Sequence, residues 1–365
     1  MCTIGQKVND FLTDNIKKSN VTGIAMVTVD NNKKEFYCLG RAKFNKTMER
    51  DTIFQIASVS KTFTALGIMK LVEMGLIDLN EPINKYLTKF KLPEKETSFD
   101  VTIEDVLCHT SGIKQMGYYG TSNKKKVVPI DVSLRDTMIK AGSLYDEQPE
   151  KKIIYSGVNY SLLQLLIEEV TNMSFSDFMQ KNILEKLGMN SSTFDWNKIM
   201  WSKVARAHGI YGMPIKRRYY SELAAAGLYS TIEDVSEFIV RIIKNFSQDE
   251  LFKQDSLKYL FKRTSRLNPL AKGAYVATCS QKKVVYSIGL NYGWNAYVAM
   301  IPSNSVGIAI LSNSMFSGKL LAEAVSIWYK DKIGELTDIN KNMLSLNLEK
   351  RRDMVKRFIS YNKFN

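Results

Sequence analysis

The stretch FQIASVSKTFTAL, residues 54–66, places Ser58 and Lys61 three positions apart at the predicted start of a helix. Residues with this spacing share one face of a helix, so we expect the two side chains to lie close together. A buried lysine with a lowered pKa can hold or accept the proton of a serine hydroxyl. The spacing also fits a helix-capping serine followed by a surface lysine. The same S-x-x-K spacing recurs at Ser111/Lys114 and Ser280/Lys283. Spacing alone therefore leaves both interpretations open.

The small number of histidines restricts the chemistry further. The chain has two, His109 and His208, so a Ser-His-Asp hydrolase would have to use one of them. The sequence contains neither the G-x-S-x-G elbow of α/β-hydrolases nor the H-E-x-x-H motif of zinc proteases. A P-loop and a G-x-G-x-x-G fingerprint are also missing from it. A nucleophile in this chain is therefore expected to work largely without histidine.

Composition and charge are those of a globular protein, with 45% hydrophobic and 24% charged residues in a chain of 365. This length suits two domains or one large one. The net charge of +14 favours attraction to anionic surfaces, envelope polymers or nucleic acid. The basic residues form only short runs, at 123–126, 216–218 and 350–352, without a zinc-finger or RNA-binding signature. We therefore expect no nucleic-acid partner, and binding to anionic polymers ranks last among the functional hypotheses.

Cysteine usage and hydropathy bear on cofactors and location. The four cysteines are far apart and form no C-x-x-C pair, which predicts neither a metal site nor a dense disulfide framework. No apolar run has the length of a membrane span, and the N-terminal residues do not resemble a secretory signal. The sequence therefore predicts no cofactor and no membrane span. The location is cytoplasmic as the sequence is written, or periplasmic or in the cell envelope if a leader has been removed.

Strand-like segments lie near both ends of the chain, with helix-like segments between them. The expected helices are 4–18, 62–74, 101–109, 159–172, 175–187, 231–246 and 318–331, and the expected strands are 23–30, 35–40, 273–280, 283–289, 295–301 and 306–314. Thr102 and either Ser230 or Thr231 are predicted helix caps. This order predicts one α/β layer made from residues 1–75 and 272–335. A helical region, 76–271, is inserted into it, and a charged, helical tail, 336–365, follows.

Five segments, in order, resemble those of serine β-lactamase-related proteins of the class C type. That group includes class C β-lactamases, penicillin-binding DD-peptidases and related esterases. The segments are FQIASVSKTFTALGIMKLVEMGLIDLNEPINKYL (54–87), IEDVLCHTSGI (103–113), the block that begins IIYSGVNYSLL (153–194), ELAAAGLYSTIEDVSEF (222–238) and YVAMIPSNSVGIAILSN (297–313). The resemblance extends over about residues 5–330. It implies an α+β fold, an α/β sandwich with an antiparallel sheet flanked by helices, as in β-lactamases and transpeptidases.

The resemblance assigns roles to particular residues. Ser58 matches the nucleophile and Lys61 matches the lysine that assists its deprotonation. Tyr155 matches the tyrosine of the Y-x-N motif, which acts as a base and then passes the proton to the leaving group. The backbone N–H groups of Ser58 and Leu290 match the two donors of the oxyanion hole. Stabilisation of the oxyanion is often the largest single contribution to catalysis. His109 matches a histidine whose role in the family is structural.

Two motifs of the family are altered in this chain. The asparagine of Y-x-N, which normally contacts the substrate amide, is replaced by Gly157. The K-T-G motif reads Ser287-Ile288-Gly289, so neither a cation nor a threonine hydroxyl is available to hold a substrate carboxylate. Lys283 lies four residues earlier, about 13 Å away along an extended strand, and is not an obvious substitute. Gly289 is kept, so the backbone can still approach an acyl group.

The resemblance therefore implies a serine hydrolase that forms an acyl-enzyme with a small-molecule or peptide acyl donor. The altered motifs argue against efficient β-lactamase activity and favour ester, amide or peptide substrates without that carboxylate. The alternative is a catalytically weak or inactive penicillin-binding-like protein with a binding or regulatory role. An aromatic stretch at 292–297, YGWNAY, fits either the wall of a substrate cleft or a buried strand.

Overall fold

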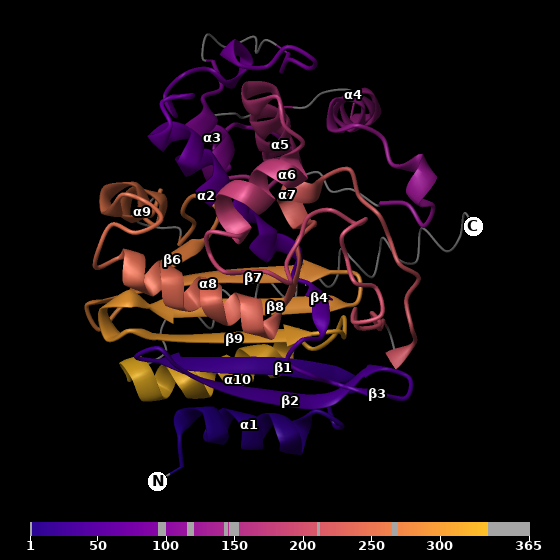
Figure 1. Ribbon diagram of the computed structural model, residues 1–365, viewed down its shortest axis with the longest axis vertical. Coiled ribbons are helices and arrows are strands. Elements are labelled where there is room, and N and C mark those ends of the chain that lie inside the picture. Colours follow the sequence, from indigo (N-terminus) through magenta and orange to yellow (C-terminus); the bar gives the residue numbers. More distant parts are fainter. Residues whose placement is uncertain are drawn as a thin grey trace.

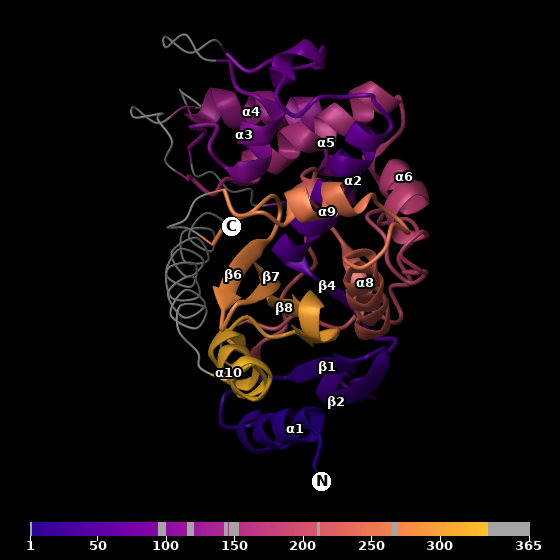
Figure 2. The same ribbon diagram turned by 90° about the vertical axis from the view of Figure 1, so that its left-hand side faces the viewer.

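The computed structural model describes residues 2–93, 100–114, 120–141, 145, 153–209, 212–264 and 269–334. A central sheet has helices on both faces, and a helical region lies at one end of it (Figures 1 and 2). The expected helical tail after residue 335 lies outside the described residues. Among the described helices, none combines the length and the apolar character needed to cross a membrane.

The central sheet joins the two ends of the chain. Its seven strands follow the order β3-β2-β1-β9-β8-β7-β6, and β4 and β5 form a separate small sheet. The strands are β1 (Gly23–Asp30), β2 (Lys33–Lys43), β3 (Lys46–Thr47), β4 (Ile53–Gln55), β5 (Tyr229–Thr231), β6 (Tyr275–Cys279), β7 (Lys282–Asn291), β8 (Trp294–Ile301) and β9 (Val306–Ser312). Strand β1 pairs with β2 on one side and β9 on the other, both antiparallel. The predicted antiparallel sheet from both chain ends is therefore confirmed.

The helices divide between the two faces of the sheet and the region at its end. They are α1 (Ile4–Asn15), α2 (Ser60–Glu73), α3 (Ile103–Cys108), α4 (Ile130–Ala141), α5 (Gly157–Thr171), α6 (Phe175–Met179), α7 (Leu223–Ala226), α8 (Ile232–Asn245), α9 (Gln254–Leu260) and α10 (Gly318–Ile333). Helices α1 and α10 cover one face, and α8 lies against the opposite face (Figure 2). Helices α2, α3, α5 and α6 pack together beyond the edge of the sheet (Figure 1).

The alternation of side chains along the strands explains the two layers. In β1, Ile24 and Met26 belong to the apolar cluster under α1 and α10, whereas Ala25 and Val27 belong to the larger cluster on the opposite face. Successive strand residues point to opposite faces, so a sheet covered on both sides is apolar at nearly every position. The larger cluster continues into α2 and α5, which makes the helical region and the sheet one packed body.

Local sequence signals account for several helix starts. Thr102 caps α3 in a capping box, in which its hydroxyl accepts from the N–H of Asp105 and the Asp105 side chain accepts in return. Thr231 caps α8 and accepts from the N–H of Asp234. Both predicted caps are confirmed, and Thr231 rather than Ser230 is the cap of α8.

Other local predictions need correction. The single helix expected over 175–187 is divided into α6 and a π-helical turn, Gln180–Leu184. Helices α4 and α9 were not expected from the sequence. Strand β7 extends two residues beyond its predicted end, to Asn291.

Candidate active site

Ser58 lies in a short 3-10 turn, Ala57–Val59, between β4 and α2. Ala57 has a φ of +51°, in the left-handed region that residues with a side chain seldom adopt. The N–H of the preceding Ile56 donates to the carbonyl oxygen of Leu228 at 3.0 Å, which ties the turn to the residue before β5. The Ser58 side chain is partly exposed, while its neighbours Ala57 and Val59 are buried. A strained, tethered turn thus presents this hydroxyl at the surface of the site.

Strand β7 passes directly against this turn at Gly289. A Cβ added to Gly289 would lie 2.1 Å from the carbonyl oxygen of Ile56, closer than any side chain allows. Glycine therefore permits the close approach of the two backbones. The next residue, Leu290, pairs with Asn295 of β8. The close approach fixes the backbone at Leu290 beside the turn that carries Ser58.

Lys61 is held inside the protein, one turn after Ser58. Its Nζ lies 3.4 Å from the Oγ of Ser58 and donates to the carbonyl oxygen of Ala225 at 2.7 Å. Only 4% of the Lys61 residue is exposed. Burial, which disfavours the charged form, lowers the pKa of Lys61 from 10.5 to about 7. The expected pair of Ser58 and Lys61 is therefore in contact, with an amine that titrates near neutral pH.

The Lys61 amine also lies close to two tyrosine rings. Its Nζ is 5.1 Å from the ring centroid of Tyr155 and 5.4 Å from that of Tyr160. Burial raises the pKa of Tyr160, and its hydroxyl donates to the carbonyl oxygen of Leu107 at 3.3 Å. Tyr160 thus remains a neutral wall of the site. Tyr155 is the ring that lines the hollow beside Ser58 and Lys61.

His109 supports Tyr155 from behind. The two rings stack with centroids 4.5 Å apart and an angle of 28° between their planes. The Nδ1 of His109 accepts from the backbone N–H of Ser156 at 3.1 Å and lies 3.0 Å from the amide nitrogen of Asn159. The Oδ1 of Asn159 accepts from the hydroxyl of Ser111 at 2.8 Å. Asn159 therefore faces His109 and Ser111.

The position of the altered K-T-G motif is closed by hydroxyl groups. The Oγ of Ser287 lies 2.6 Å from the Oγ1 of Thr62, and that Thr62 hydroxyl lies 2.7 Å from the carbonyl oxygen of Gly273, to which it donates. The Ser287 residue is buried, and Ile288 adds an apolar side chain to the wall. Lys283 does not line this hollow, in line with its distance along β7. Among the described residues that line the hollow, Lys61 and His109 are the two that can carry a positive charge.

The hollow at this site is shallow, and its volume of about 250 Å³ includes space open to solvent. It is lined by Ser58, Lys61, His109, Tyr155, Leu270, Gly273, Ala274, Tyr275, Ser287 and Ile288. The structure thus brings together Ser58, Lys61, Tyr155 and Ser287 of the residues singled out from the sequence. Gly157, the first residue of α5, does not line the hollow, nor do Gly289 and Leu290, which lie along β7.

Sequence reasoning missed the support for the wall at residues 270–275. Lys272 is 3% exposed, and its Nζ lies 3.2 Å from a carboxylate oxygen of Glu104 and 4.1 Å from the ring centroid of Tyr259. The Tyr259 hydroxyl also donates to Glu104. This cluster anchors the chain immediately before Gly273. A lysine within the motif-free segment NPLAKGAY, 268–275, gave no signal of this contact in the sequence.

The chain is similar to a curated staphylococcal protein and to a solved penicillin-binding protein homologue. The chain is 25% identical to Protein flp from Staphylococcus aureus (strain MW2) over 320 residues, which is 84% of this chain and 63% of that protein. The chain therefore spans less than two-thirds of this curated relative. The penicillin-binding protein homologue from Pyrococcus abyssi, described as octameric, has a TM-score of 0.72 at 25% identity and is covered over 76% of its chain and 86% of this one.

A further solved structure extends the likeness in fold. The class C β-lactamase from Rhodobacter sphaeroides has a TM-score of 0.73 at 18% identity, over 89% of this chain and 98% of the other. At this identity the likeness concerns the fold alone. The model of the family described as Beta-lactamase matches residues 8–327, which include every residue of the hollow. The chain therefore belongs to the Beta-lactamase family.

Proposed function

We propose that this protein is a serine hydrolase that forms an acyl-enzyme at Ser58. The observation that carries the proposal is the contact between a partly exposed serine hydroxyl and a buried lysine whose pKa lies near 7. A lysine of ordinary pKa is protonated at neutral pH and takes up no proton. Burial gives Lys61 a substantial neutral fraction, so its amine can accept the proton of Ser58 as the hydroxyl attacks.

Acylation then takes place in two stages, attack by Ser58 and release of the leaving group. The Oγ of Ser58 forms a bond to the carbonyl carbon of the substrate, and its proton passes to the neutral amine of Lys61, directly or through the hydroxyl of Tyr155, which gives up its own proton as it receives one. Collapse of the tetrahedral intermediate breaks the bond to the leaving group, which takes up that proton. We assign the backbone N–H groups of Ser58 and Leu290 to the oxyanion, because β7 runs against the Ser58 turn at Gly289. Water then attacks the acyl-enzyme and releases the acid.

The substrate class follows from the wall opposite Ser58. A β-lactam or a peptide with a terminal carboxylate needs a cation or several hydroxyl donors near residues 287–288. Here the Ser287 hydroxyl is paired with Thr62, and Ile288 is apolar. A carboxylate placed there would lose water without gaining a charged partner. We therefore propose ester, amide or peptide substrates that carry no carboxylate at this position.

The test is turnover of p-nitrophenyl esters, compared with turnover of a chromogenic cephalosporin. We expect ester hydrolysis that Ser58→Ala removes and that Ser280→Ala leaves unchanged. Ser280→Ala is the matched control, because Ser280 also precedes a lysine by three residues but bonds to Ile333, away from the hollow. Turnover of the cephalosporin as fast as that of the esters would contradict the assignment of substrate class.

The second candidate is a binding or regulatory protein without turnover. The replacement of the motif asparagine by Gly157 and of K-T-G by Ser287-Ile288-Gly289 favours it. The retained contact between Ser58 and Lys61 opposes it, because a binding function alone requires no activated serine. Failure to hydrolyse or trap any acyl donor, in a protein that remains folded, would leave this candidate in place of the hydrolase.

A further inference from the structure

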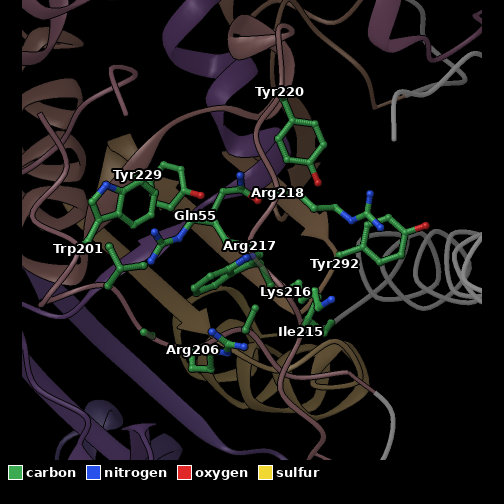
Figure 3. A pocket seen from close by; sticks show the side chains of 14 residues that line it. Gln55, Trp201, Arg206, Ile215, Lys216, Arg217, Arg218, Tyr220, Tyr229 and Tyr292 are labelled. Atoms are coloured by element: carbon green, nitrogen blue, oxygen red, sulfur yellow. The ribbon is translucent and has the colours of Figure 1, made fainter. Parts of the chain in front are cut away.

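A second hollow, with a volume of about 460 Å³ that includes space open to solvent, lies where β4, β5, β8 and the turn between β7 and β8 meet the loop segments 201–207 and 215–220. Figure 3 shows the side chains around it. It is lined by Gln55, Trp201, Val204, Ala205, Arg206, Ala207, Ile215, Lys216, Arg217, Arg218, Tyr220, Tyr229, Tyr292 and Trp294, which we call the basic pocket. None of these residues lines the hollow beside Ser58.

The charge of the basic pocket is entirely positive. Four of its lining residues are cationic, Arg206, Lys216, Arg217 and Arg218, and none is an aspartate or a glutamate. Within the described parts of the chain, no carboxylate lies at ion-pair distance from Arg206, Lys216 or Arg217. By contrast, the nearby Lys203, which does not line the pocket, pairs with Asp51 at 2.6 Å. Among the described residues, the protein therefore supplies no carboxylate partner for these three cations.

Aromatic rings hold two of the arginines in place. The guanidinium carbon of Arg217 lies 3.5 Å from the ring centroid of Trp201, and that of Arg218 lies 5.5 Å from that of Tyr292. Figure 3 shows these two pairs on opposite sides of the pocket, with Arg206 and Lys216 between them and lower in the view. Stacking on a ring restricts an arginine while leaving the edge of its guanidinium available for hydrogen bonds.

Exposed basic side chains are usually just solvated, and this is the ordinary explanation for Arg206 and Lys216. Two observations distinguish the basic pocket from such a surface. The four cations surround one concave volume with aromatic walls, and two of them are oriented by those walls. Like charges that converge on a hollow repel one another, so an anion bound among them relieves that repulsion. Arginine forks match the oxygens of phosphate in pairs.

The basic pocket is connected to the site around Ser58 through one hydrogen bond. Gln55, on its wall, accepts from the side-chain nitrogen of Asn291 at 2.8 Å. Gln55 precedes Ser58 by three residues, and Asn291 follows Leu290 directly on β7. Three residues of extended chain span at most about 11 Å. The pocket wall thus begins at most about 11 Å from Ser58.

We propose that the basic pocket binds a phosphate group carried by the acyl chain of the substrate, and this link to the substrate rests on the proposed function. Four cations suit the multiple charge of phosphate better than the single charge of a carboxylate. The pocket would then supply the anionic anchor that Ser287 and Ile288 do not offer. The recognised part of the substrate lies beside Gln55 and Tyr292 rather than at residues 287–288.

The binding experiment uses inorganic phosphate and pyrophosphate as probes. Trp201 and Trp294 line the pocket, so tryptophan fluorescence reports on it directly. We expect saturable binding at fixed ionic strength, weakened at least tenfold in Arg206→Gln/Lys216→Gln. These two residues are exposed, so their replacement leaves the core intact. The control Lys17→Gln/Lys18→Gln removes the same charge from exposed residues after α1 and should bind like the wild type.

Equal affinity of the pocket variant and the wild type would overturn the proposal, and so would equally tight binding of acetate. The titration is repeated in Ser58→Ala, where binding should be unchanged because the pocket does not use that hydroxyl. The binding result can therefore be interpreted even if the protein proves to have no hydrolase activity.

The catalytic experiment compares p-nitrophenyl esters with an acyl chain of about 10 Å that ends in a phosphate, a methyl phosphodiester or a hydroxyl. We expect kcat/KM for the phosphate ester to exceed that for the hydroxyl ester at least tenfold, and Arg206→Gln/Lys216→Gln to remove this preference. The phosphodiester arm separates a terminal phosphate from a phosphate within a longer chain. Wild-type enzyme that treats the phosphate and hydroxyl esters alike would contradict the assigned anchor, while leaving ester hydrolysis itself established.

Discussion

The Nζ of Lys61 lies 3.4 Å from the Oγ of Ser58 and 2.7 Å from the carbonyl oxygen of Ala225, and the amine is buried. In the proposed mechanism the neutral amine keeps its hydrogen bond to Ala225 and accepts from the serine hydroxyl. In its charged form it is an ammonium group with little water around it, which is why its pKa falls to about 7. In the proposed mechanism this contact couples the reactivity of Ser58 to pH.

The first prediction concerns this pH dependence. Above pH 7 the neutral form of Lys61 predominates, and below it each pH unit lowers the neutral fraction about tenfold. The acylation rate should therefore rise from pH 5.5 to 7 and level off above pH 8. Pre-steady-state release of p-nitrophenol measures it. In Lys61→Arg, which stays charged, we expect a loss of roughly 100-fold or more. A wild-type rate independent of pH across this range would exclude Lys61 as the proton acceptor.

A second prediction concerns His109 as a positioning residue. His109 has a φ of +58°, a conformation that asparagine tolerates well, so His109→Asn removes the ring without straining the backbone. Tyr155 then loses its stacking partner, and we expect kcat to fall roughly 10- to 100-fold with little change in KM. The control is His208→Asn, since His208 is buried but bonded to Asn313 outside the hollow. A fall of similar size in both variants would indicate a purely structural effect.

A third prediction restores the motif that this chain lacks. In Ser287→Lys/Ile288→Thr, a cation and a hydroxyl face the hollow beside Ser58. A charge-assisted hydrogen bond contributes about 1.5–3 kcal/mol, so penicillin should acylate the variant roughly 10- to 100-fold faster than the wild type. Intact-mass spectrometry over time measures the rate. Ile288→Thr alone tests the hydroxyl without disturbing the bond between Ser287 and Thr62. A folded double variant with no gain would show that these positions do not set the preference.

A fourth prediction concerns the close approach at Gly289. A Cβ there meets the backbone oxygen of Ile56, which cannot rotate away, so Gly289→Ala should lower the free energy of unfolding by about 2 kcal/mol or more. Gly188→Ala is the control, because nothing lies within 4 Å of its added Cβ. Its positive φ should cost about 1 kcal/mol. Urea unfolding compares the two. Equal losses would mean that β7 can shift away from the Ser58 turn.

Much of the fold could be predicted from local sequence. Thr102 and Thr231 mark their helices because a hydroxyl followed by an acidic residue three positions later is a local signal. The strands at 295–301 and 306–314 are apolar at nearly every position, which indicates a sheet covered on two sides. Helix α9 was missed, because its short segment Gln254–Leu260 has few apolar positions and depends on contacts with α2.

The site was predictable only in part, because several of its contacts join distant segments. Lys61 and Ala225 lie 164 residues apart in the sequence, and their contact exists only because the fold places them side by side. The same holds for Lys272 and Glu104. The basic run 216–218 and the aromatic stretch 292–297 were each visible in the sequence. That Arg218 meets Tyr292 was not, because it follows from the path of the loop segment that precedes α7. The positive φ of Ala57 likewise results from the hydrogen bond that ties its turn to Leu228, and an alanine in the sequence does not indicate such a conformation.

The most direct test of the acyl-enzyme at Ser58 is peptide mapping after quenching a reaction with p-nitrophenyl acetate at pH 8. We predict one acetyl group per protein molecule, on the peptide that contains Ser58, and its absence from Ser58→Ala. Acetylation of another residue in the wild type during turnover, or unchanged turnover by Ser58→Ala, would contradict it.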